Sequence, residues 1–82
     1  MDRRPASVAY DPHVDALAID MVEHPRPVRT VRFDRRRAVD YDAEGRIVSI
    51  VLREVSRGVK LRDLPERATV QAVVERLARE HG

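Results

Sequence analysis

The chain has no cysteine and no tryptophan, and its aromatic residues are two tyrosines and one phenylalanine. Without cysteine there are no disulfides, zinc–thiolate sites or thiol nucleophiles. Small secreted domains usually need such cross-links, so their absence predicts a cytoplasmic protein. The charged start, Met1 to Pro5, leads into no apolar segment of the signal-peptide type. The longest apolar run, Ile47 to Leu52, is interrupted by Ser49 and is too short to cross a bilayer.

Glycine is also scarce, with three residues in 82, and none of them belongs to a phosphate-cradling loop. The three histidines are far apart in the sequence and show no zinc-ligand spacing. No serine stands in the glycine-flanked context of a hydrolase nucleophile. We therefore expect no catalytic residues, no cofactor and no metal ligand, and predict that the protein is not an enzyme.

Two acidic segments invite a catalytic or metal-binding interpretation. Asp40 to Ile47 imitates the first eight positions of a calcium loop, but Val51 stands at the twelfth position, where such a loop needs glutamate. Asp11 and Asp15 flank a turn, where aspartate ordinarily accepts hydrogen bonds from backbone N–H groups. We interpret both segments as turns, with Asp11, Asp15 and Tyr10 as the first residues to test for catalysis.

The length favours one domain over residues 1–82. It would comprise a β-rich part (7–56), an irregular crossover (57–68) and a C-terminal helix (69–81). Alternating apolar residues predict a small antiparallel sheet of five strands, with the helix packed on one face, an α+β fold. The predicted strands are 7–11, 15–21, 28–33, 38–41 and 46–53.

The helix is predicted from a buried stripe with Thr69 as its N-cap. The stripe consists of Val70, Val73, Val74, Leu77 and Ala78. It would cover the strand residues that alternation places inward, namely Val31, Phe33, Val39, Tyr41, Val48, Ile50 and Leu52. Leu61 and Leu64 of the crossover are expected to touch the same core.

Three stretches carry a family resemblance. They are Tyr10-Asp11-Pro12 with Asp15-Ala16-Leu17, Val39-Asp40-Tyr41-Asp42 with Gly45-Arg46-Ile47-Val48, and Ile50-Val51-Leu52. In order and spacing they resemble the prokaryotic domain-of-unknown-function family DUF2283, over residues 10–56. The resemblance implies a small cytoplasmic β-rich domain without established activity, and some members look like the antitoxins of toxin–antitoxin pairs. Relatives usually have tyrosine at the position of Ala18 and often glutamate at that of Val51.

One helix can cover only one face of a sheet, so the opposite face should be open. Its residues are small and more apolar than those of a fully solvated face, which predicts a protein partner or a homodimer. The expected partner-binding residues are Ala16, Ala18, Asp20, Arg32, Ile47, Ser49 and Val51. The favoured function is a protein-interaction module, antitoxin-like in kind.

The alternative function is nucleic-acid binding through the basic segment Arg26–Arg37. Its candidate phosphate-binding residues are Arg29, Arg32, Arg35, Arg36 and Arg37, which together with Arg26 give six positive charges opposed only by Asp34. Against this alternative, the net charge of the chain is only +2 and aromatic residues for base stacking are few. A solvated hairpin is the simpler interpretation of the segment. We expect no membrane partner.

Overall fold

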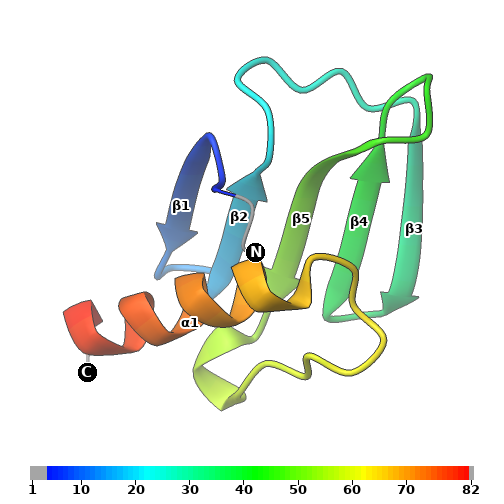
Figure 1. Ribbon diagram of the computed structural model, residues 1–82. Coiled ribbons are helices and arrows are strands. Elements are labelled where there is room, and N and C mark those ends of the chain that lie inside the picture. Colours follow the sequence, from blue (N-terminus) through cyan, green and yellow to red (C-terminus); the bar gives the residue numbers. More distant parts are fainter. Residues whose placement is uncertain (1–3, 82) are drawn as a thin grey trace.

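A computed structural model describes residues 4–81 of the chain, with His81 described by its backbone alone. The charged start, Met1 to Arg3, and Gly82 lie outside the described residues. Five antiparallel strands and one C-terminal α-helix confirm the predicted α+β class (Figure 1). The elements are β1 (Ser7–Asp11), β2 (Ala16–Asp20), β3 (Arg29–Asp34), β4 (Arg37–Tyr41), β5 (Ile47–Arg53), the 3₁₀ turn η1 (Val55–Arg57) and α1 (Arg67–His81).

The strands are ordered β1-β2-β5-β4-β3, so the last strand of the sequence lies at the centre of the sheet. After the β1–β2 hairpin the chain crosses to the far edge, and β3, β4 and β5 then return to β2 as a meander (Figure 1). The central position suits β5, which is the most apolar strand and has neighbours on both sides. The acidic turn at Gly45 joins β4 to β5 with a positive φ of 79°, a conformation that glycine adopts without strain.

The core lies between one face of the sheet and α1, which crosses that face (Figure 1). Six side chains there are essentially inaccessible to solvent: Leu17, Ile19, Val39, Ile50, Leu52 and Val70. Leu64 is buried and Leu61 packs against the cluster, as predicted for the crossover. We call this side of the sheet the helix face and the opposite side the open face.

The predicted inward position of Phe33 is wrong. A register shift between Arg32 and Asp34 interrupts the pairing of β3 with β4, and Phe33 lies at this irregularity. Its side chain is 37% exposed, with the Arg37 guanidinium 5.8 Å from the ring centroid. Phe33 is thus outside the buried core, on the edge strand and beside Arg37.

The helix begins at Arg67, two residues earlier than predicted, so Thr69 is not its N-cap. The amide of Val70 donates to the carbonyl of Glu66 at 3.0 Å, which places Thr69 inside the first turn, where it is buried. Ala78, predicted to be in the buried stripe, is exposed, and Val73, Val74 and Leu77 are only partly buried. The last turns of α1 extend beyond β1 at the edge of the sheet (Figure 1). Within residues 4–81, no helix is long and apolar enough to span a membrane.

Candidate interaction surface

A hydrogen-bonded polar row crosses all five strands on the open face. Strand register aligns Ser7, Asp20, Ser49, Asp40 and Thr30 side by side. Ser49 Oγ donates to Asp20 Oδ1 at 2.5 Å, and Ser7 Oγ donates to Asp20 Oδ2 at 3.2 Å. Thr30 Oγ1 donates to Asp40 Oδ1 at 2.5 Å. The two carboxylates are therefore held in fixed orientations on the sheet.

A second row, next to the polar one, consists of small side chains. Ala9, Ala18, Val51 and Ala38 are aligned by register, and Arg32 ends the row on the edge strand β3. Ala18, Val51 and Ala38 are partly buried by their neighbours, whereas Ala9 and Arg32 are exposed. The centre of the open face is thus shallow and apolar, with a charged residue at one end.

A third, shorter row completes the open face. Asp11, Ala16 and Arg53 are aligned on β1, β2 and β5. Asp11 and Arg53 are exposed, whereas Ala16 is partly buried. The apolar row therefore lies between two carboxylates, Asp20 and Asp40, on one side and the oppositely charged Asp11 and Arg53 on the other.

Six of the seven residues predicted for the partner surface lie together on this face: Ala16, Ala18, Asp20, Arg32, Ser49 and Val51. Placing Ile47 with them was wrong. A register shift at Asp40/Tyr41 pairs Ile47 with Tyr41, and both pack against the helix-side core. A bulge adds a residue to one strand and so reverses the alternation beyond it. The sequence prediction also missed Ala9 and Arg53, whose alternation within β1 and β5 was the available signal.

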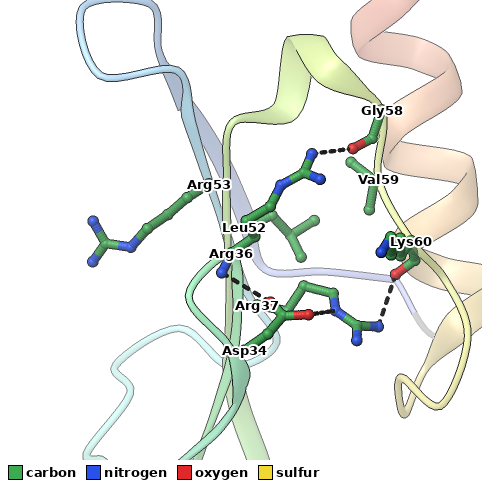
Figure 2. A pocket seen from close by; sticks show the side chains of 8 residues that line it. All are labelled: Asp34, Arg36, Arg37, Leu52, Arg53, Gly58, Val59 and Lys60. Carbon is green, nitrogen blue, oxygen red and sulfur yellow. Dashed lines mark hydrogen bonds and ion pairs between the residues drawn. The ribbon is translucent and has the colours of Figure 1, made fainter.

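The basic segment does not form one continuous ribbon, because two of its arginines are bound to the crossover. Arg36 Nη2 donates to the carbonyls of Glu54 (3.0 Å) and Gly58 (2.6 Å). Arg37 Nη1 donates to the carbonyls of Lys60 (3.1 Å) and Arg62 (2.6 Å). Figure 2 shows both guanidinium groups directed from the strand toward the crossover.

A cavity of about 30 Å³ lies beside these two arginines (Figure 2). Arg37 Nε also donates to Asp34 Oδ2 at 3.0 Å, which closes one side of the cavity. A volume of this size accommodates about one water molecule, not an organic cofactor. Arg36 and Arg37 therefore hold the crossover against the sheet.

The other arginines of the basic segment point in different directions. Register places Arg29 on the helix face, where its guanidinium lies 4.8 Å from the centroid of the Tyr41 ring. Arg32 lies on the open face. Arg35, at the β3–β4 turn, is 78% exposed and forms a 3.5 Å ion pair with Glu54. Only Arg32 and Arg35 of the five present mainly exposed side chains away from the helix face.

The sequence model of DUF2283, described as proteins of unknown function, matches residues 7–56, more than half of the chain. The chain belongs to the DUF2283 family. No curated protein and no solved structure matches the chain significantly.

The DUF2283 match covers all five strands and ends at Ser56, which donates hydrogen bonds to the Asp15 carboxylate. Ser56 donates to it from its amide (3.1 Å to each oxygen) and its hydroxyl (2.6 Å), and Tyr10 Oη donates at 2.7 Å. The hydrogen bonds from Ser56 and Tyr10 hold the pKa of Asp15 below its usual value, and the same contact raises the pKa of Tyr10. The predicted turn chemistry is confirmed at Asp11, whose Oδ1 accepts a hydrogen bond from the His13 amide at 2.9 Å, whereas Asp15 ties the β1–β2 turn to η1.

The second acidic segment of the sequence, Asp40 to Ile47, also forms a turn. Asp42 Oδ1 accepts hydrogen bonds from the amides of Glu44 (3.0 Å) and Arg46 (2.8 Å), and Oδ2 accepts one from Arg46 Nε (3.0 Å). These donors, first among them the Arg46 amide, lower the pKa of Asp42. Among residues 4–81 no group of three or more histidine, aspartate or glutamate side chains is arranged to hold a metal ion.

Proposed function

We propose that this DUF2283 protein is a small non-catalytic interaction module, which binds a protein partner or a second copy of itself through the open face of its sheet. The observation that carries the proposal is the row of Ala9, Ala18, Val51 and Ala38 across four neighbouring strands. Two layers of a folded protein pack about 10 Å apart when the side chains between them are small enough to interdigitate. A row of alanines with one central valine meets that condition.

The polar row beside it favours specific binding over nonspecific contact. Asp20 and Asp40 are already oriented by Ser7, Ser49 and Thr30, so little side-chain freedom remains to be lost when a partner approaches. Ordering a flexible charged side chain at an interface costs about 0.5–1.5 kcal/mol, which such pre-orientation reduces. The hydrogen-bonded carboxylates are thus suited to fix the register of a partner.

Charges of both signs flank the apolar row. Asp20 and Asp40 lie on one side of it, Asp11 and Arg53 lie on the other, and Arg32 stands at its end. An interface with an apolar centre and mixed charges at its rim selects a partner of complementary pattern. This arrangement also lets the face complement a second copy of itself, since acids of one copy meet arginines of the other.

We assign the module an antitoxin-like role in the cytoplasm. The support is the resemblance of some family members to antitoxins, together with the lack of cysteine, which leaves the domain without the cross-links of small secreted proteins. An antitoxin of this kind acts by covering the surface of a toxin. The product of a gene adjacent to that of this protein is therefore the first partner to test.

The test is a Val51→Glu variant, examined by sedimentation velocity alone and with the neighbouring-gene product. Val51 lies at the centre of the open face, so an unpaired carboxylate there would be buried by any partner at a cost of several kcal/mol. In the free protein the new side chain points to solvent, and we expect an unchanged circular-dichroism spectrum. Complex formation should be lost.

The matched control is Val14→Glu, the same substitution at a 64% exposed valine in the β1–β2 turn. It should leave both folding and association unchanged. If Val51→Glu unfolds the free protein, the face is internal core and the two-layer picture is wrong. If it leaves association intact, the open face is not the binding surface.

The second candidate function is nucleic-acid binding through the basic segment, which the exposure of Arg32 and Arg35 favours. Because Arg36 and Arg37 are engaged with backbone carbonyls, few charges are available for phosphates. Binding through so few phosphate contacts is weak and sensitive to salt. A salt titration of fluorescence anisotropy with single-stranded and duplex DNA and RNA tests it, and binding that persists at physiological ionic strength would favour this function.

A further inference from the structure

A groove lined by apolar side chains and bordered by basic ones lies on the helix face, at the β1 edge of the sheet. It has a volume of about 580 Å³ and runs between α1 and the segment Arg4–Pro5. Val8, Val73 and Leu77 provide its apolar wall; Val8 is 46% exposed and the other two are partly buried. The last turns of α1 extend beyond β1, with no strand of the sheet beneath them (Figure 1). The end of α1 thus lies past the edge strand of the sheet.

The edge of β1 next to this groove presents backbone hydrogen-bonding groups outward. The amide of Met21 donates to the carbonyl of Val48 at 2.8 Å, in register with the β2–β5 pairs. Hydrogen-bonded pairs alternate along an antiparallel ladder, so residues 17 and 19 bond toward β5 and residues 16, 18 and 20 toward β1. The partners of 16, 18 and 20 in β1 are residues 11, 9 and 7. Val8 therefore directs its N–H and C=O away from β2, along the outer edge.

The charge around the groove is mainly positive. Arg4, Arg76 and Arg79 line it, opposed by Glu80 alone. The Arg76–Glu80 contact is a 3.9 Å pair between exposed side chains, of a kind that contributes little and exchanges readily. A segment that complements this rim carries carboxylates.

We propose that β1 and the overhanging turns of α1 bind an extended acidic segment of a partner protein, which adds to the sheet as a sixth strand. A strand about 4.8 Å beyond β1 would pair with the outward groups of Val8 and lie beneath the end of α1. Its helix-facing side chains alternate with solvent-facing ones. An apolar helix-facing residue packs on Val8 and Leu77, and carboxylates two positions before and after it, on the same face of the strand, reach Arg76 and Arg79. This site uses none of the open-face residues and does not depend on the proposed function.

The probe is a fluorescein-labelled peptide in which glutamate and valine alternate at every second position with threonine between them (repeat Glu-Thr-Val-Thr), so that one face carries both carboxylates and apolar side chains. It is titrated with the full chain and followed by anisotropy. The double variant Arg76→Glu/Arg79→Glu should weaken its binding by about tenfold or more, because two charge pairs become repulsive. Val8→Pro should abolish binding, because proline removes the outward N–H while the β1–β2 ladder stays intact. The matched control for charge is Arg62→Glu, at a side chain that is 91% exposed and remote from the groove, and it should leave binding unchanged.

The same peptide with lysine in place of glutamate tests the sign of the charge and should bind about tenfold more weakly or not at all. Circular dichroism of each variant shows whether loss of binding reflects unfolding; if Val8→Pro unfolds, Val8→Asp replaces it. Equal affinity for both peptides would overturn the acidic specificity. Absence of binding by the glutamate–valine peptide overturns the site. So does a homodimer of the wild type that Val8→Pro converts to monomer, because β1 would then be occupied by a second copy.

Discussion

The two halves of α1 are buried to different extents, and shortening one apolar side chain in each half tests this difference. Val70 in the first turns is fully buried, whereas Leu77 near the end is partly exposed. Val70→Ala removes two buried carbons, about 0.8 kcal/mol each, and with the cavity left behind should cost about 2 kcal/mol. Leu77→Ala removes three carbons but from a site still in contact with water, so it should cost about 1–2 kcal/mol.

For a domain of this size 1 kcal/mol corresponds to a shift in melting temperature of about 4–8 °C, so Val70→Ala should melt about 8–16 °C lower than the parent. Leu77→Ala should lower it by a smaller amount. Ala78→Gln is the control, since Ala78 is exposed despite its place in the predicted stripe, and it should shift stability by less than about 0.5 kcal/mol. Thermal melts followed by circular dichroism show which variant loses more stability. A larger loss for Leu77→Ala than for Val70→Ala would refute the overhanging end of the helix.

Three further predictions concern the turns and the arginines. Asp15 and Asp42 have pKa values lowered in the folded state, so the stability they contribute is complete above their unfolded pKa, near 3.8, and is lost as the pH falls through the folded pKa. Urea unfolding at several pH values should show a decline on acidification that is shallower in Asp15→Asn. Arg37→Gln should destabilise the fold by about 1 kcal/mol and speed amide exchange in residues 58–62, because two crossover carbonyls lose their donor, whereas Arg62→Gln should do neither. Arg32→Ser/Arg35→Ser should abolish any low-salt DNA or RNA binding, and a variant that binds as tightly as the parent would contradict phosphate contact through these residues.

The sheet could be predicted because its signals are local. Alternation located all five strands to within two residues at each end, and the apolar stripe of 70–77 located the helix. Asp15 begins the predicted strand 15–21 but lies just outside β2, since its φ of 54° is left-handed, a conformation that aspartate tolerates better than most residues. Helix and strand placement therefore followed from periodicity alone.

The side chains whose burial or sheet face was predicted wrongly lie where the pairing of two neighbouring strands is irregular. Ile47 and Phe33 both lie at register shifts, and a bulge depends on the partner strand as much as on its own sequence. The binding of Arg36 and Arg37 to the crossover joins residues 18 to 25 positions apart. No local pattern encodes contacts of that range, so an exposed basic ribbon was the natural prediction from sequence.

The most direct test of the open face as a binding surface is a methyl spectrum of selectively labelled alanines. Ala9, Ala18 and Ala38 lie on the open face, whereas Ala68 and Ala78 are exposed on α1 and serve as internal controls. Spectra are recorded at two protein concentrations about a hundredfold apart, and with the neighbouring-gene product. The proposed function predicts that the open-face methyls shift or broaden while those of Ala68 and Ala78 stay in place. Shifts confined to the helix alanines, or no shift under any of these conditions, would contradict it.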